Sequence, residues 1–282
     1  MDRLVVVFNC LWVLGKFCKI RQRPTTNVNG IILSYGIYLG DIQLDIEVEL
    51  KDHMGSDLSV VNAARVSFDK ESEWDKGFSG EICEGLLSRG DKRLIAYLAK
   101  HNHWSPFGHA SIQFRIKAPV FVARQLVKHQ IGLTWNEVSR RYVSDDPSIY
   151  YPDTWRAAAT DKKQGSDEEK TIEYVKDSYP ETAYSEYDED VGVSALYSKS
   201  VKLSLNTYDR LIAGGVAPEQ ARMVLPQSMF TEWYWSGTLY AFARVCNLRC
   251  KPDAQIETQL VANKIDEIAK DLFPVSWEHL RK

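Results

Sequence analysis

The segment ASIQFRIKAPVFVARQLVKHQI, residues 110–131, contains a strand pattern followed directly by a helix pattern. Apolar and polar residues alternate strictly from Ala110 to Lys117, which is typical of a strand with one buried face. The natural partner of such a strand is an antiparallel neighbour. Pro119 fits the first turn of a helix over residues 120–131, because its missing N–H would have no intrahelical partner there. These two elements predict an α+β fold with an antiparallel-rich central sheet flanked by helices.

The rest of the chain is interpreted as further helices and loops around this sheet. Apolar residues at helical spacing, with capping residues before them and glycine or proline after them, predict these helices. They are expected over residues 58–66 after a Ser56-Asp57 cap, 92–101 after an Asp91 cap, 197–211 before Gly214-Gly215, 218–225, 237–249 after a Ser236 cap, and from Pro252 through Ile268. The charged segment 69–90 is expected to be mostly loop. Because neither a repeat nor a clear linker divides the chain, we predict a single domain with loop insertions.

The composition is that of a folded globular protein. Of the 282 residues, 44% are hydrophobic and 26% are charged. The formal net charge of −3 argues against a protein that is basic as a whole and binds nucleic acid. The five cysteines form no C-x-x-C pair, which argues against a disulfide framework or a zinc ribbon. A reducing compartment such as the cytoplasm is therefore expected.

Two segments differ from the predicted domain. Residues 4–14 are apolar, but a bilayer span needs roughly 20 such residues and no convincing cleavage site follows, so neither an anchor nor a signal peptide is favoured. We expect residues 1–40 to form a poorly ordered extension and residues 41–282 to form the domain. Residues 161–190 contain eleven acidic and four basic residues, a net charge of −7, and are expected to form a flexible, solvated insertion.

A basic cluster follows the predicted strand. Against the single acid Glu137, residues 120–142 contain the cations Arg124, Lys128, Arg140 and Arg141. A basic cluster in an acidic protein is the composition expected of an anion pocket, for example one for phosphate. If the helix extends over residues 120–131, Arg124 and Lys128 share one face, and so do Gln125 and His129. A solvated helix face would have the same composition, so both interpretations stay open.

Two polar segments lie on either side of this helix. WNEVSRRY, residues 135–142, combines amide, carboxylate, hydroxyl and guanidinium groups that can bind a phosphate, a sugar hydroxyl and a base edge, although an ordinary turn can contain the same residues. HNHWSPFGH, residues 101–109, has a histidine spacing that a metal site could use. Since no acidic partner lies close by, we favour His103 and Ser105 as hydrogen-bonding groups on a loop. The sequence contains neither a Gly-rich phosphate loop nor a Ser-His-Asp signature.

Several motifs together resemble the flavin-dependent thymidylate synthases. They are AARVSF (63–68), HNHWSPFGH, APVFVARQLVKHQ with NEVSRRY, ARMVLP (221–226) and NLR…DAQIE (247–257), and their order and spacing match from about residue 42 to the C-terminus. The resemblance implies reductive methylation of dUMP to dTMP, with methylenetetrahydrofolate as carbon donor and FAD, reduced by NADPH, as hydride source. It also implies a homotetramer with active sites between subunits, no catalytic cysteine, and neither a nucleic-acid nor a membrane partner.

The resemblance implies roles for individual residues. The residues that match dUMP-binding positions are Gln125, Lys128, Glu137, Ser139, Arg140, Arg141, Arg222 and Arg249. The residues that match FAD-binding positions are His103, Ser105, Lys128, His129, Gln130 and Glu137. Arg249 is implied to be catalytic, because a fixed cation beside ionised uracil N3 would make C5 more nucleophilic. No metal site is implied.

The chain departs from the family pattern at the flavin-binding positions. The family signature is Arg-His-Arg, seven residues, then Ser, whereas this chain has Lys128-His129-Gln130, eight residues, then Ser139. Thr238 and Arg244 stand where flavin-contacting asparagines are expected. Weaker FAD binding or a rearranged flavin phosphate site is therefore a hypothesis. The alternatives to the enzyme are a catalytically silent relative that binds nucleotide or flavin, and a metal-dependent hydrolase built on the histidine cluster.

Overall fold

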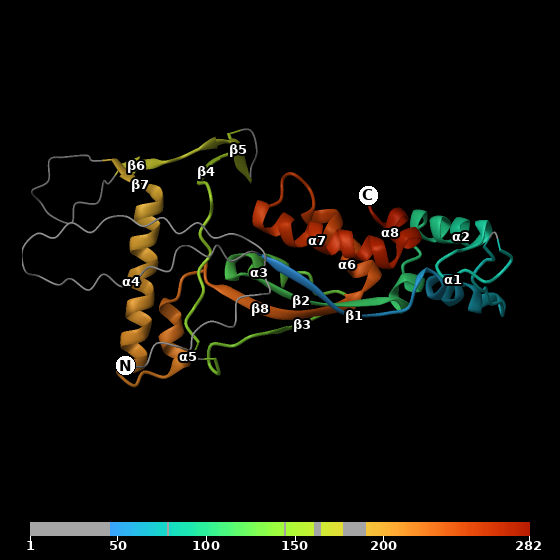
Figure 1. Cartoon of the computed structure of the whole chain (residues 1–282), viewed down its shortest axis with the longest axis horizontal. Helices are drawn as coiled ribbons and strands as arrows, with labels where there is room; N and C mark the ends of the chain where they lie inside the picture. Colours follow the sequence, from blue (N-terminus) through green and yellow to red (C-terminus); the bar gives the residue numbers. More distant parts are fainter. Residues whose placement is uncertain (1–45, 78, 144, 161–164, 177–189) are drawn as a thin grey trace, which may run out of the picture. The chain divides into compact units, whose positions relative to one another are not determined.

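The computed structural model describes residues 46–77, 79–143, 145–160, 165–176 and 190–282, all within one compact unit, Gln43–Lys282 (Figure 1). The extension expected at residues 1–40 lies outside the described residues, and so do residues 161–164 and 177–189 of the acidic insertion. The described part of that insertion contains two short strands, β5 (Ser166–Thr171) and β6 (Tyr174–Lys176).

The central element is a four-stranded sheet in the order β1-β2-β8-β3, in which every pair of neighbours is antiparallel. Its strands are β1 (Glu47–Met54), β2 (Ser111–Pro119), β8 (Phe230–Thr238) and β3 (Leu133–Glu137). The alternating pattern therefore predicted β2 and its antiparallel pairing correctly, and the predicted α+β class is confirmed.

The β2–β8 pair forms the centre of the hydrophobic core. Ile112, Phe114 and Ile116 of β2 are at most 1% exposed, and Trp233 and Trp235 of β8 are equally buried. Phe114 pairs with Trp235 and Ile116 pairs with Trp233, so these side chains lie on one face of the sheet. Each fully buried side chain of this kind contributes about 1.5–3 kcal/mol of transfer free energy.

The start of the helix after β8 differs from the prediction. Ser236 does not cap this helix, because it lies inside β8, pairs with Gln113 and accepts a hydrogen bond from the Gln113 amide (2.9 Å). The cap is Thr238, whose side chain accepts a hydrogen bond from the backbone N–H of Ala241 (3.2 Å). The aromatic residues of β8 extend the strand through the position that the sequence suggested as a helix start.

Two helices cover the buried face of the sheet, as Figure 1 shows: α6 (Leu239–Arg249) and α7 (Ile256–Leu272). Phe242 of α6 packs edge-on against Phe114 and Trp235, with ring centroids 5.1 and 5.4 Å apart. The helix expected to begin at Pro252 begins instead at Ile256, after a Gln255 N-cap.

The helix after β2 is shorter than predicted. It forms α3 (Val120–Leu126), and Val127 is its C-cap. Lys128 and His129 therefore lie beyond the helix, and the expected i,i+4 pairs with Arg124 and Gln125 do not share a helical face. Beyond the helix, His129 makes a tertiary hydrogen bond with Arg249, described below.

The remaining elements surround this centre. They are α1 (Asp57–Arg65), η1 (Val66–Phe68), α2 (Arg89–Lys100), η2 (Ser105–His109), β4 (Arg156–Ala158), β7 (Asp190–Gly192), α4 (Val193–Ala213), α5 (Pro218–Ala221), η3 (Arg222–Val224) and α8 (Pro274–Leu280). β4 pairs with β5, and β6 pairs with β7. Among the described residues, no helix combines the length and the apolar character needed to cross a bilayer.

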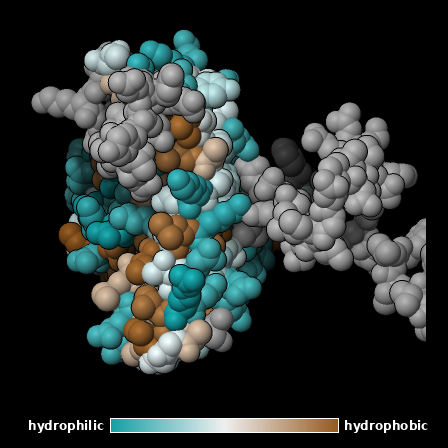
Figure 2. Space-filling view, turned by 90° about the vertical axis from the view of Figure 1, so that its left-hand side faces the viewer, coloured by the Kyte–Doolittle hydropathy of each residue, from teal (hydrophilic) through white to brown (hydrophobic). Residues whose placement is uncertain are grey.

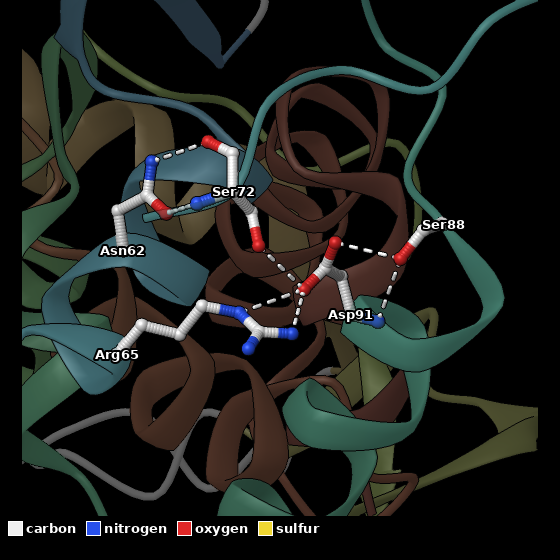
Figure 3. Close-up of polar contacts among 5 residues, drawn as sticks. All are labelled: Asn62, Arg65, Ser72, Ser88 and Asp91. Atoms are coloured by element: carbon white, nitrogen blue, oxygen red, sulfur yellow. Dashed lines mark hydrogen bonds and ion pairs between the residues drawn. The ribbon is translucent and has the colours of Figure 1, made fainter. Parts of the chain in front are cut away.

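A buried carboxylate joins α1, the following loop and α2 (Figure 3). Asp91 is 3% exposed, and its Oδ1 accepts hydrogen bonds from Arg65 Nη2 (2.6 Å) and from the Ser72 hydroxyl (2.9 Å). Its Oδ2 accepts a hydrogen bond from the Ser88 hydroxyl (2.7 Å). Ser88, and not Asp91, is the N-cap of α2, and it accepts from the Asp91 backbone N–H (3.1 Å). Asn62 completes the network by pairing with the backbone of Ser72.

These contacts determine how Asp91 responds to pH. Burial raises the pKa of the carboxyl, but the hydrogen bonds from Ser88, Arg65 and Ser72 and the charge of Arg65 outweigh it, so the pKa lies below its usual value. The unfolded state therefore binds the proton more readily than the folded state does. The stability contributed by Asp91 is fully present above the unfolded pKa and is lost as the pH falls through the lowered pKa.

Asp91→Asn should lower the free energy of unfolding by about 3 kcal/mol at pH 7, because it removes one partner of a buried ion pair. The difference from the unmodified protein should shrink as the pH falls below about 4. Chemical denaturation at several pH values measures both effects. Asp271→Asn, at an exposed position of α7, is the matched control and should have little effect. A pH-independent difference would contradict the assigned role of the Asp91 charge.

Candidate functional site

A cleft of about 690 Å³ lies where the ends of β2, β3 and β8 meet the segment around η3. Three residues with implied dUMP-binding roles, Glu137, Arg140 and Arg222, line it. Arg124, part of the basic cluster, lines it too, as do Arg115 and Lys117 of β2, which the sequence analysis did not select. Five cationic side chains thus line this cleft together with the carboxylates of Glu137, Asp145, Asp146 and Glu232. Arg115 and Lys117 form ion pairs with Glu232 and Glu47, so Arg124, Arg140 and Arg222 are the cations that could bind a phosphate.

Glu137, the last residue of β3, is oriented by two donors on the sheet. Its Oε1 accepts a hydrogen bond from the Thr231 hydroxyl (2.8 Å), and its Oε2 accepts one from the Trp135 indole (3.2 Å). Trp135 stacks on the buried Trp233, with ring centroids 4.4 Å apart. The carboxylate is therefore fixed at the rim of the cleft, where it can accept a hydrogen bond from a ligand hydroxyl or N–H.

A second cleft, of about 530 Å³, is lined by Gln125, Lys128 and Arg249. A third, of about 420 Å³, shares Gln125 and Lys128 with the second cleft and Arg124 and Gln227 with the first. The three clefts therefore form one continuous surface around α3. The structure brings the implied nucleotide-binding residues of α3, β3, η3 and α6 to this surface, although they divide between its two ends.

Gln125 is held in place by α7. Its side-chain carbonyl accepts a hydrogen bond from the Thr258 hydroxyl (3.2 Å), and its amide N–H donates to the Gln255 side-chain carbonyl. The Gln255 amide in turn donates to the buried Glu257 (3.0 Å), which forms an ion pair with Arg156 (2.7 Å). Local sequence patterns assign no role to these supporting residues, because every contact except Gln255–Glu257 joins segments far apart in the chain.

His129 supports Arg249, the implied catalytic residue at the end of α6. The Arg249 Nε–H donates a hydrogen bond to His129 Nε2 (3.0 Å). Burial, together with the charges of Arg249 and Arg244, lowers the pKa of His129 to about 4. The imidazole is therefore neutral at pH 7, with Nε2 as acceptor, and it fixes the guanidinium of Arg249 without adding a charge.

The other implied residues lie outside the three clefts. Ser139 accepts hydrogen bonds from the backbone N–H and the Nε–H of Arg141, both at 3.4 Å. Gln130 is exposed in the turn after α3. His103 is exposed after α2, and Ser105 begins η2. Across the described ranges, no group of three or more His, Cys, Asp or Glu side chains could hold a metal ion.

The comparisons with known proteins identify the family. The family model described as "Thymidylate synthase complementing protein" matches residues 49–275. A flavin-dependent thymidylate synthase of Thermus thermophilus is 36% identical over 237 residues, which cover 83% of this chain and 76% of that protein. The chain belongs to the flavin-dependent thymidylate synthase family. The family member from Kosmotoga olearia is 35% identical over 236 residues, covering 82% of this chain and 88% of its own.

A solved structure with the same fold supports the family assignment. It is a UMP/dUMP methylase, PolB from Streptomyces cacaoi, bound with 5-Br dUMP. It superposes with a TM-score of 0.62 at 29% identity, covering 83% of this chain and 94% of its own. The resemblance stated from the sequence motifs is thereby confirmed at the level of family and fold.

The residues at the second cleft fit a flavin cofactor that carries phosphate, and the names of the relatives imply flavin dependence. Lys128 and Arg249 place two cations beside the amide of Gln125 on an open surface, a donor set suited to phosphate oxygens. No cysteine that the structure describes lines any of the three clefts. Cys246 is fully buried, and burial raises the pKa of its thiol, so it is poorly placed to act as a nucleophile.

His129→Gln should make the stability of the folded protein less sensitive to acid. Because the folded pKa of His129 lies below its unfolded value near 6.5, the unfolded state binds more protons between pH 6.5 and 4, and acidification destabilises the folded protein. Glutamine can still accept from Arg249 but does not titrate. Between pH 7 and pH 4, the melting temperature of the variant should fall less steeply than that of the unmodified protein. The same substitution at the exposed His279 should leave the pH profile unchanged, and an equal effect there would contradict the assignment.

Proposed function

We propose that this chain catalyses the reductive methylation of dUMP to dTMP, with methylenetetrahydrofolate as carbon donor and FAD, reduced by NADPH, as hydride source. The observation that carries the proposal is that Glu137, Arg222 and Arg249, which match nucleotide-binding positions of the family, all line one continuous cationic surface. A catalytically silent relative is less favoured, because the residues of this surface are held by specific contacts.

The phosphate of dUMP fits the cations of the first cleft. Arg222 and Arg140 line this cleft, and a charge-assisted hydrogen bond from either contributes about 1.5–3 kcal/mol. Arg140 also donates to the backbone carbonyl of Asp145, which limits the positions that its guanidinium can adopt. Gln125 and Glu137 supply an amide and a carboxylate for the sugar and the base.

Arg249 is the residue that we assign to catalysis. Its guanidinium is half-buried and is held by neutral His129, so its position and charge are set before substrate binds. A cation fixed beside uracil N3 stabilises the negative charge of the ionised base and makes C5 a better nucleophile for the incoming carbon. The neutral state of His129 leaves this positive charge uncompensated, which favours an anionic base.

The flavin would be held by Lys128, His129 and Gln130 in the turn after α3, with His103, Ser105 and Glu137 as further contacts. When bound and reduced by NADPH, FAD supplies the hydride that completes the new methyl group. Lys128 provides a charge for a phosphate but not the forked donors of arginine, and Gln130 provides no charge.

We further propose a homotetramer in which each active site combines the first cleft of one subunit with the second cleft of another. The division of the implied residues between the two ends of the surface supports this arrangement. Helix α4 exposes Leu196 (47%), Leu203 (69%) and Ile212 (38%), and Figure 2, drawn from the side where α4 lies in Figure 1, shows hydrophobic residues among hydrophilic ones. Exposed apolar groups of this kind are suited to self-association.

The remaining assignments complete the proposal. Residues 41–282 form the catalytic domain, and residues 1–40 precede it as an extension. The substrates are small molecules, with neither nucleic acid nor a membrane as partner, and the enzyme works in the cytoplasm. The net charge of −3 and the few scattered cysteines support these assignments.

Tritium release from 5-tritiated dUMP tests the proposed reaction. Release should require FAD, NADPH and methylenetetrahydrofolate together, and omitting any one of them should abolish it. Arg249→Ala should lower kcat by about 100- to 1000-fold, because it removes preorganised charge stabilisation. Arg93→Ala, at an exposed position of α2, serves as the control. Protein that binds dUMP and FAD without releasing tritium would instead be the silent relative.

Subunit complementation tests the shared site. Arg222→Ala and Arg249→Ala change opposite ends of the surface, so each homotetramer should be nearly inactive. Co-refolded mixtures should recover part of the activity, because some sites then combine an intact first cleft with an intact second cleft. Activity that never exceeds the sum of the separate variants would show that both arginines act within one subunit.

A further inference from the structure

Two arginines of α6 lie near the half-buried His129. Arg249 donates a hydrogen bond to its Nε2, Lys128 precedes it in the chain, and Arg244 lies near enough for its charge to help lower the pKa of the imidazole. Arg244, unlike the other two, has no role from the resemblance, because it stands where an uncharged asparagine is expected. The position is exposed, so its guanidinium is accessible to a ligand.

The path of the turn after α3 places Gln130 beside the middle of α6. His129 contacts Arg249 near the C-terminal end of this helix. Three residues later, the Gly132 carbonyl accepts a hydrogen bond from the backbone N–H of Thr238 (3.0 Å), directly before the helix begins. The turn therefore runs antiparallel to α6, and Gln130 lies between these two contacts.

Arg244 lies between these same two contacts along α6, as Gln130 does along the turn. A Cβ on Gly132 would be 3.1 Å from the Cβ of Ala241, which shows which side of the helix the turn crosses. Arg244 follows Ala241 by three residues, and residues three apart share a side of an α-helix. The helix thus brings a guanidinium to the region where the turn carries the uncharged Gln130.

The positive charges here outnumber the carboxylates: of the described residues that line the second cleft, Lys128, Arg156 and Arg249 are cationic and Asp253 is acidic. In the part of the chain that the structure describes, neither Lys128, Arg244 nor Arg249 forms an ion pair. Like charges gathered around a half-buried group repel one another. A bound anion removes this repulsion, and a phosphate or diphosphate has the oxygen acceptors that guanidinium groups bind.

We propose that Arg244 binds a phosphate group of the flavin dinucleotide and supplies, from α6, the positive charge that Gln130 lacks in the turn. The inference rests on the proposed function and identifies a binding residue for the same site. It also modifies the hypothesis of weaker FAD binding. The phosphate site keeps the same number of positive charges, but one of them comes from Arg244 on α6 and not from residue 130 in the turn.

FAD titration of the full chain by calorimetry tests the proposal. Arg244→Gln keeps a polar side chain but removes the charge, and should weaken FAD binding by about 10- to 100-fold, the effect expected for one charge-assisted hydrogen bond. The dependence of FAD affinity on ionic strength should also become less steep. Arg93→Gln on α2 is the matched control and should leave affinity unchanged.

Two further measurements make the test specific to charge and to phosphate. Gln130→Arg added to Arg244→Gln should restore most of the FAD affinity, because it returns the cation to the turn. Riboflavin, which has no phosphate, should bind equally to the unmodified protein and to Arg244→Gln. If riboflavin binding fell as much as FAD binding, the variant would have damaged the site generally, and the proposal would be wrong.

The outcomes separate this inference from the proposed function. Unchanged FAD affinity in Arg244→Gln, in a protein that binds FAD and releases tritium, would overturn the role of Arg244 and leave the enzyme assignment intact. A loss of dUMP affinity without a loss of FAD affinity would place Arg244 at the other ligand and equally overturn the proposal. Failure of the unmodified protein both to bind FAD and to release tritium would overturn the two together.

Discussion

The antiparallel pairing of β2 with β8 is the constraint on which the other parts of this structure depend. Each strand continues directly into a helix that carries site residues, β2 into α3 and β8 into α6. Because the strands run in opposite directions, the two helices begin at opposite ends of the sheet. α6 then returns across the buried face, so that its last residue, Arg249, contacts His129 just beyond α3. The opposite directions of these two strands thus bring the residues of the candidate site together.

The polar groups of this surface are held in place by neighbouring elements. Many of them belong to strands and helices whose other faces are packed in the core. Glu137 is fixed by Thr231 and Trp135 of the sheet, and Gln125 is fixed by Gln255 and Thr258 of α7. Such contacts hold the polar groups before a ligand arrives, which reduces the reorganisation required on binding.

Local sequence patterns predicted some elements correctly and failed at others for identifiable physical reasons. Strict alternation identified β2, and the Gly214-Gly215 pair identified the end of α4. The predicted end of α3 was wrong: the helix ends at Leu126, and His129 contacts Arg249, 120 residues away, which a local pattern does not reveal. Asp91 looked like a cap because acidic residues are common near helix starts, whereas Ser88, one turn earlier, has the capping geometry.

In the candidate site too, sequence motifs identified some residues and missed those whose role depends on contacts between distant parts of the chain. Motif spacing selected Glu137, Arg222 and Arg249, and the structure places all three on one surface. The residues that hold them could not be selected in this way. Arg156 and Glu257, for instance, are ordinary surface residue types, and their role follows from an ion pair across 101 positions of the chain.

The close approach of the turn to α6 also restricts which residues this loop can contain. Gly132 has a positive φ of 76°, and a side chain there would press on Thr238 and Ala241. Gly237 is equally confined, since a Cβ would come within 2.5 Å of the Gly132 carbonyl oxygen. A side chain at either position would therefore displace the turn from α6. The placing of His129 beside Arg249 thus depends on two residues that have no side chain.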